Sequence, residues 1–211
     1  MKILRLVFIL SIISMISVPV LAQDEEGSWR NFEVYINGGM GIPFGDINNW
    51  LDSLGADPGF QIGVGGGYCF TERFSTGLYF NYSQLEMDGP FDRNFRLFDF
   101  GAYAKYALTG ESSFEPYGKI SAGMVISKYP TWVLYGVLRE QSYDPDLTVS
   151  AGLGLLFYTS EYSGVFIETS YHVDLVEGVK AEYQGNKFSI DHNVSYMQVT
   201  IGINAFFGPD E

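Results

Sequence analysis

Ser170, His172 and Asp174 are the residues whose types first suggest catalysis, because they alternate along one apolar-polar stretch of the chain. A serine activated by a histidine that an aspartate orients is the nucleophile of many hydrolases. Side chains on one face of a strand are spaced about 6.6–6.8 Å apart by the rise per residue. A nucleophile and its base must approach to about 2.6–3.2 Å, so the spacing argues against a triad.

A second group of the same residue types lies further along the chain, where Asp191 and His192 stand between Ser189 and Ser195. No motif around them is specific enough to assign a reaction. The acidic residues also show no spacing typical of a metal site. We therefore assign no catalytic residue, no metal ligand and no cofactor, and we predict that the protein is not an enzyme.

The elements that carry these residues are predicted to be strands. Eight segments show the period-two alternation of a strand with one apolar face. They lie near 31–43, 59–71, 73–86, 95–108, 115–127, 146–159, 163–176 and 193–207. In each segment one alternate set of residues is apolar along the middle of the strand, and every mid-strand charge falls on the other set. In the last segment, for example, Val199, Ile201 and Ile203 alternate with Thr200 and Gly202.

Two architectures bury one face of eight antiparallel strands: a soluble barrel with an apolar interior and a membrane barrel with an apolar exterior. The polar set is dominated by Gly, Ser, Thr, Asn and Tyr, which fits a crowded interior better than a solvated surface. Short connections alternate with longer ones, as periplasmic turns alternate with extracellular loops. The sequence predicts an all-β, eight-stranded, antiparallel up-and-down transmembrane β-barrel.

The N-terminal segment has the layout of an export signal. Lys2 and Arg5 precede an apolar run that reaches Val20-Leu21-Ala22 before Gln23, a pattern typical of a cleaved signal peptide. We predict a signal peptide over 1–22 and one barrel domain over 23–211, with no further domain after it. The net charge of −13 excludes nucleic acid as a partner, because phosphates would be repelled.

The interior of an eight-stranded barrel holds only its own side chains. Tyr35, Tyr79, Tyr103 and Tyr158 are predicted to point inward, which argues against a wide pore. The ionisable residues predicted to form a lumen charge cluster are Glu33, Asp99, Lys105, Lys119, Glu168, His172 and Asp174. We expect Lys105 and Lys119 to reach Glu33 and Glu168, because buried charges need partners. The cluster is either a salt-bridged plug or a gated ion path.

The C-terminal stretch TIGINAFF resembles the assembly signal of outer-membrane barrels, with Thr200, Gly202, Ala205 and Phe207 at the positions that carry it. The stretches IPFGD and GGGYCFTERFSTGLYFNYS are similar to those of the outer-membrane protein beta-barrel domain family. The mature chain resembles the small eight-stranded group that includes the OmpA membrane domain, OmpX and OmpW.

This resemblance implies a location in the cell outer membrane, reached through the cleaved signal peptide. The implied partners are outer-membrane lipid, lipopolysaccharide and the barrel-assembly machinery, and we expect a monomer. The group spans adhesins, structural anchors, narrow pores and a few lipid-modifying enzymes. Two alternatives therefore stand beside a structural or surface-interaction role: a narrow channel for ions or small apolar solutes, and a lipid A-modifying enzyme with its site at the external rim.

The loops are predicted to carry the interaction with any extracellular ligand, which the sequence does not name. Loop 128–145 is unusually apolar, with Trp132, Leu134, Tyr135 and Leu138. It could extend its hairpin above the membrane, close over the barrel mouth or offer a binding surface. A short helix is expected within loop 44–58. The acids predicted to line the external rim are Asp46, Asp52, Asp57, Asp88 and Asp92, and a divalent cation could bridge them to lipopolysaccharide phosphates.

Overall fold

A computed structural model of the chain describes residues 31–45, 56–87, 94–109, 113–131, 139–142, 145–175, 179–183, 186–190 and 194–208. The predicted signal peptide, the predicted helix in loop 44–58 and the apolar residues Trp132, Leu134, Tyr135 and Leu138 lie outside these ranges. Of the predicted rim acids, Asp57 is described.

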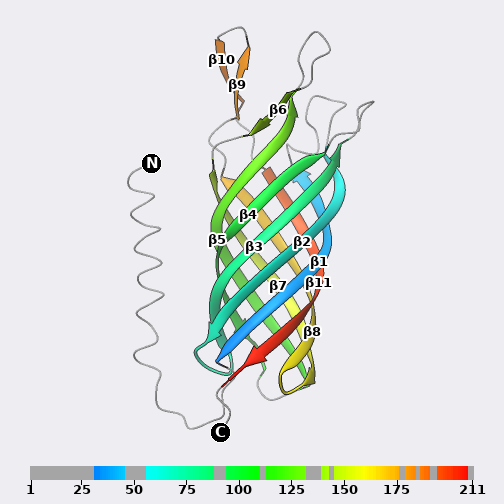
Figure 1. Cartoon of the computed structure of the whole chain (residues 1–211), viewed down its shortest axis with the longest axis vertical. Helices are drawn as coiled ribbons and strands as arrows, with labels where there is room; N and C mark the ends of the chain where they lie inside the picture. Colours follow the sequence, from blue (N-terminus) through cyan, green and yellow to red (C-terminus); the bar gives the residue numbers. More distant parts are fainter. Residues whose placement is uncertain are drawn as a thin grey trace.

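Eight long strands form one closed antiparallel barrel (Figure 1). They are β1 (Phe32–Gly45), β2 (Ala56–Cys69), β3 (Phe74–Met87), β4 (Phe95–Ala107), β5 (Phe114–Thr131), β7 (Asp146–Ser160), β8 (Ser163–Leu175) and β11 (Val194–Phe207). Each pairs with the next along the chain, and β11 returns to pair with β1. The predicted all-β, eight-stranded up-and-down barrel is confirmed. In the described part of the chain no helix is long and apolar enough to cross a membrane.

Three shorter strands lie beyond one end of the barrel in Figure 1. The strand β6 (Arg139–Ser142) pairs with residues 128–131 of β5, so this loop begins by extending its hairpin. A separate hairpin joins β9 (Val179–Tyr183) to β10 (Asn186–Ile190), in a segment that the sequence analysis treats as a loop. The turns at 70–73 and 161–162, at the other end, are short. Outer-membrane barrels have short periplasmic turns, so the family resemblance assigns that end to the periplasm.

Side chains along the strands alternate between two environments. Ile36, Leu78, Ile120, Leu153 and Ile201 are exposed on the outer surface, at 55%, 70%, 61%, 64% and 61%. Their neighbours along the strands are buried in the lumen, as Asn37, Tyr79 and Thr200 are. Such an outer surface suits hydrocarbon, and the backbone polar groups behind it are satisfied by the closed ladder.

Aromatic rings gather on the outer surface at both ends of this apolar band. At the external end Tyr82 lies between Phe60 and Phe98, with ring centroids 5.8 Å and 5.1 Å away. At the periplasmic end the close ring pairs are Phe32–Tyr68, Tyr68–Phe70 and Phe114–Phe157. Aromatic belts of this kind mark the two membrane–water interfaces, so the belts give the depth of the barrel in the bilayer.

A charge on the outer waist should destabilise the barrel strongly. Leu153→Arg places a guanidinium at the middle of β7 and is expected to cost about 2–4 kcal/mol, because Arg is poorly tolerated at the bilayer midplane. The matched change Leu108→Arg, just after β4 at the periplasmic interface, should cost about 0–1 kcal/mol. Urea unfolding in lipid vesicles measures both, and equal losses would contradict the assignment of the outer surface to lipid.

Candidate functional site

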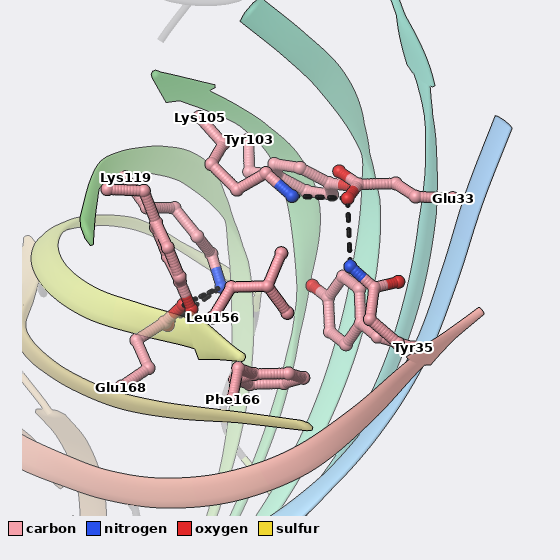
Figure 2. A pocket seen from close by; sticks show the side chains of 10 residues that line it. Glu33, Tyr35, Tyr103, Lys105, Lys119, Leu156, Phe166 and Glu168 are labelled. Carbon is pink, nitrogen blue, oxygen red and sulfur yellow. Dashed lines mark hydrogen bonds and ion pairs between the residues drawn. The ribbon is translucent and has the colours of Figure 1, made fainter. Parts of the chain in front are cut away.

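Two ion pairs cross the periplasmic half of the lumen (Figure 2). Lys105 on β4 and Lys119 on β5 are directly opposite in the register of the two strands. Like charges at such positions, with Cβ atoms about 4.5–5.5 Å apart, repel. Each ammonium turns to a different carboxylate: Lys105 bonds to Glu33, and Lys119 Nζ lies 2.8 Å and 3.0 Å from the two oxygens of Glu168. The ion pairs predicted from the sequence are therefore formed.

Glu33 is 1% exposed and is surrounded by donors in addition to Lys105. Ser75 Oγ and Tyr103 OH each donate to its Oε1 at 2.8 Å, and Asn204 Nδ2 donates to its Oε2 at 3.1 Å. A buried carboxylate loses the hydrogen bonds that water would supply. The four donors replace them, so Glu33 is held at a single place in the lumen.

Glu168 has a smaller set of neutral donors. Tyr117 OH donates to its Oε2 at 3.0 Å, beside the bonds from Lys119. The ammonium of Lys119 also lies 5.3 Å from the ring centroid of Tyr35 and 5.6 Å from that of Tyr103, a distance at which ring faces attract cations. The negative charge of Glu168 is therefore neutralised mainly by Lys119.

Large rings fill the space between these ion pairs. The inward glycines are predicted to leave room for them, and at Gly65 a Cβ atom would overlap the ring of Tyr35. The cavity that remains among the charged groups, Leu156 and Phe166 has a volume of about 20 Å³. That volume holds about one water molecule. The periplasmic half of the lumen is thus a packed interior and not an open passage.

A layer of polar side chains lies toward the external end of the ion pairs. Gln61 Nε2 donates to Asn37 Oδ1 at 3.1 Å and to Asn81 Oδ1 at 3.2 Å. These three amides come from adjacent strands, β2, β1 and β3. These hydrogen bonds link the three neighbouring strands on the lumen side through neutral groups.

The prediction that the side chains of Ser170 and His172 are too far apart to interact is wrong. Ser170 Oγ lies 3.0 Å from His172 Nε2, because the rise fixes the spacing of backbone positions and not of side-chain tips. The acid that faces His172 is also not Asp174. It is Asp99, whose Oδ2 lies 3.6 Å from His172 Nδ1 and whose Oδ1 accepts from Tyr79 OH at 2.9 Å.

The lumen charge cluster therefore forms two groups. Glu33, Lys105, Lys119 and Glu168 make the ion pairs of the periplasmic half, whereas Asp99, His172 and Asp174 lie closer to the external end. Asp174 is fully buried and directly opposite Thr148 in the register. Within the described ranges, no set of three His, Cys, Asp or Glu residues is arranged to hold a metal ion.

An apolar cluster lies at the external end of the lumen, among buried polar side chains such as Ser83, Thr148 and Asp174, so the polar set is interrupted there. Leu85, Phe95 and Leu97 are 0–2% exposed and form one cluster with Ala56, Val125 and Tyr196. The Tyr196 ring stacks on His172, with centroids 4.8 Å apart and planes 12° from parallel. Asp174, opposite Val194, lies beyond the register level of Tyr196 and His172 toward the external end, so this acid and the apolar cluster share the same end of the lumen.

The other predicted site residues are placed as follows. Thr200 and Gly202 of the assembly signal face the lumen, and Phe207 is 55% exposed at the periplasmic aromatic belt. Ala205 lies on the outer face, on the same alternate set as Phe207. Ser195 donates to the Phe44 carbonyl oxygen at 3.2 Å. Asp191 and His192 lie outside the described residues, so their predicted grouping with Ser189 stays a prediction.

Five residues that surround the ion pairs are absent from the predicted site: Ser75, Tyr117, Leu156, Phe166 and Asn204. A signal for them was present, because each falls on the same alternate set as an inward polar residue of its strand. An apolar residue on the polar set looks like an exception when one strand is considered alone. Its place beside the ion pairs follows only from the register of all eight strands.

A comparison with known protein families identifies the family of this barrel. The family described as outer membrane protein beta-barrel domain matches residues 8–210, which include every strand. The chain belongs to that family. Membership places the protein in the outer membrane, but no curated protein matches the sequence closely enough to count as a relative.

Solved structures of small outer-membrane barrels share the fold. The crystal structure of neisserial surface protein A (NspA) is 14% identical with a TM-score of 0.58, and the match covers 86% of this chain and all of that one. The solid-state NMR structure of the outer membrane protein AlkL in lipid bilayers is 11% identical with a TM-score of 0.51, and the match covers 89% and 95%. At these identities the likeness extends to the fold alone.

Removing one lysine should destabilise the barrel more than removing the other. Lys119→Met leaves Glu168 with Tyr117 as its remaining side-chain donor and is expected to cost about 3–5 kcal/mol, the cost of a broken buried pair. Lys105→Met should cost less, because Ser75, Tyr103 and Asn204 still donate to Glu33. Urea unfolding in phosphatidylcholine vesicles measures the difference.

Two further variants control this comparison. Lys128→Met changes a lysine outside the lumen and should have little effect. Adding Glu168→Gln to Lys119→Met removes the unpaired charge and should restore part of the stability. Equal losses for Lys105→Met and Lys119→Met would show that the neutral donors do not stabilise Glu33.

Proposed function

We propose that the protein is a structural and surface-interaction protein of the outer membrane, whose extracellular loops contact other molecules and whose lumen serves stability. The observation that carries this proposal is the packing of the lumen: in the described strands two ion pairs, several tyrosine side chains and an apolar external cluster occupy it. With the interior occupied, the parts left to meet a partner are the loops and the outer rim.

The route to the membrane is part of the same proposal. Residues 1–22 would direct export and be removed, and the barrel-assembly machinery would recognise the last strand through Thr200, Gly202, Ala205 and Phe207. The position of Phe207 in an exposed aromatic belt supports this interpretation, because a receptor can reach a ring on the outer surface of β11.

An enzymatic role receives little support from the geometry of Ser170 and His172. These side chains are 7% and 3% exposed, and they lie beneath Tyr196 and the apolar cluster at the external end. A nucleophile must be open to its substrate. We therefore propose that the hydrogen-bonded pair of Ser170 and His172, with Asp99 3.6 Å from the imidazole, is structural and not a catalytic triad.

A conductance measurement separates the plug from the gated ion path. Purified barrel in a planar bilayer is expected to show no discrete openings, because the space among the charged residues is about one water molecule in size. Lys105→Ala should leave the trace unchanged. Steady openings of the wild-type protein whose size changes in Lys105→Ala would replace the plug with an ion path.

Deletion of the apolar loop tests the surface role. Replacing residues 130–144 with a short Gly-Ser linker removes β6 and the segment with Trp132, Leu134, Tyr135 and Leu138 but no barrel pair. We expect normal assembly, measured by heat-modifiable migration on gels, and reduced adhesion of cells to matrix-coated surfaces. A matched shortening of the β9–β10 hairpin compares the two loops, and adhesion unchanged by both deletions would contradict the proposal.

A further inference from the structure

The seam between the first and last strands is the one pair of barrel strands that no connection along the chain holds together. β1 and β11 pair from Phe32 opposite Phe207 to Gly45 opposite Val194 (Figure 1), whereas every other pair of neighbouring barrel strands is consecutive along the chain. A connection keeps two strands close when the ladder between them opens. Bringing together two segments that are far apart in the chain costs loop-closure entropy. The seam is therefore the pair that is expected to open first.

One buried carboxylate joins the two sides of this seam. Glu33, the second residue of β1, accepts a hydrogen bond at 3.1 Å from the side-chain amide of Asn204 on β11, which lies 171 positions away in the chain. Asn204 is 3% exposed and is directly opposite Tyr35, the next inward residue after Glu33. The hydrogen bond thus runs diagonally across the seam on the lumen side, away from solvent.

The other donors to Glu33 come from strands on the far side of β2. Ser75 on β3 and Tyr103 on β4 donate to Oε1, and Lys105 on β4 bonds to Oε2. Figure 2 shows Tyr103 and Lys105 beside the carboxylate. Gly67 on β2 is directly opposite Glu33, and a Cβ atom there would lie 2.6 Å from Tyr103 OH, so β2 leaves room for the phenol. The first four strands therefore hold the carboxylate in place without β11.

The negative charge of Glu33 strengthens its hydrogen bond to Asn204. A hydrogen bond to an ionised acceptor is about twice as strong as one between neutral groups, and the low dielectric of an interior strengthens it further. Lys105 and Asn204 share Oε2, so the lysine compensates the charge without displacing the amide. A single carboxylate thus serves both the ion pair and the seam.

The hydrogen bond at the other end of the seam is of a different kind. Ser195 on β11 donates at 3.2 Å to the backbone oxygen of Phe44, its direct partner in the register. Donor and acceptor are both neutral there. Of these two hydrogen bonds, the one between Asn204 and Glu33 is therefore expected to stabilise the seam more.

We propose that Glu33 and Asn204 form a latch that keeps the β1–β11 seam closed. The strands β1 to β4 position the carboxylate, and Asn204 attaches the last strand to it. The seam then cannot open without breaking a buried, charge-assisted hydrogen bond. The effect of the latch is local to the seam, whereas loss of a lumen ion pair destabilises the whole barrel, and it does not depend on what the loops bind.

Hydrogen exchange of the folded barrel in detergent micelles, resolved by peptide, tests the latch. Asn204→Ala is expected to raise the exchange rates of amides in β1 and β11 by about ten-fold or more and to leave those in β3, β4 and β5 unchanged. Asn204→Asp places a second carboxylate beside Glu33 and should raise the seam rates further. The double variant Glu33→Gln/Asn204→Asp again pairs one amide with one carboxylate, so its seam should exchange more slowly than that of Asn204→Asp.

Two further substitutions are matched controls for the latch. Asn37→Ala removes another inward asparagine of β1, whose side-chain oxygen accepts from Gln61 on β2 and not across the seam, and it should leave the seam rates unchanged. Ser195→Ala removes the neutral hydrogen bond of the seam and should raise the seam rates less than Asn204→Ala does. Heat-modifiable migration on gels verifies that each variant is folded.

A covalent link across the seam should make the latch unnecessary. Val34 and Ala205 are directly opposite each other on the outer face, and the spacing of Cα atoms in such a pair suits a disulfide. Cys69 is a free cysteine, so the link is built from Val34→Cys and Ala205→Cys in a Cys69→Ser background. With the disulfide formed, Asn204→Ala should no longer raise the exchange rates of β1 and β11.

Three results would overturn the proposal. The first is unchanged exchange of β1 and β11 in folded Asn204→Ala. The second is an equal rise in all strands, which would mean that Asn204 serves overall stability and not closure. The third is a rise that persists in the disulfide-linked barrel. If Asn204→Ala does not fold, the same criteria apply to Asn204→Ser, whose shorter hydroxyl side chain weakens the bond and does not remove every donor.

Discussion

The backbone pairing of β1 with β11 is the constraint on which the rest of the structure depends. In hydrocarbon an unpaired strand edge leaves each N–H and C=O without a partner, at several kcal/mol per group. The register from Phe32 opposite Phe207 to Gly45 opposite Val194 joins the first strand to the last, so the ring has no edge. Closure at eight strands sets the width of the interior. The pleat then decides which side chains must fill that width, and their chemistry has to be compatible with burial.

Burial explains the asymmetry of the lumen. At the periplasmic end the inward positions include two opposing lysines, so two carboxylates and several phenols are needed to neutralise and solvate them. At the external end Leu85, Phe95 and Leu97 need no such partners and simply exclude water. A solute that enters from outside must pass this apolar cluster and then two ion pairs whose lysine side chains are 14% and 15% exposed. Both ends therefore favour a lumen that stabilises the barrel, and both direct the search for function to the outer rim and the loops.

The period-two pattern made the eight barrel strands predictable, since few folds besides a lipid-facing barrel keep one alternate set of residues apolar along the middle of every strand. It also predicted the ion pairs of Lys105 and Lys119, because adjacent strands leave buried lysines few possible partners. The pattern could not reveal the contact of Ser170 with His172, which depends on how far an imidazole leans along a strand. It gave a signal for β9, where Val179, Ala181 and Tyr183 alternate with charges, but five residues are too few to separate a strand from chance.

The same register that fills the lumen also fixes what the outer surface presents. The backbone positions of residues on paired strands cannot move apart without breaking ladder hydrogen bonds, as those of Arg96 and Lys128 on β4 and β5 cannot. Extracellular loops gain adaptability at the cost of ordering when they bind, whereas groups on paired strands lose little conformational freedom. Recognition on this barrel can therefore take two physically different forms, through side chains on the paired strands and through the connections between the strands.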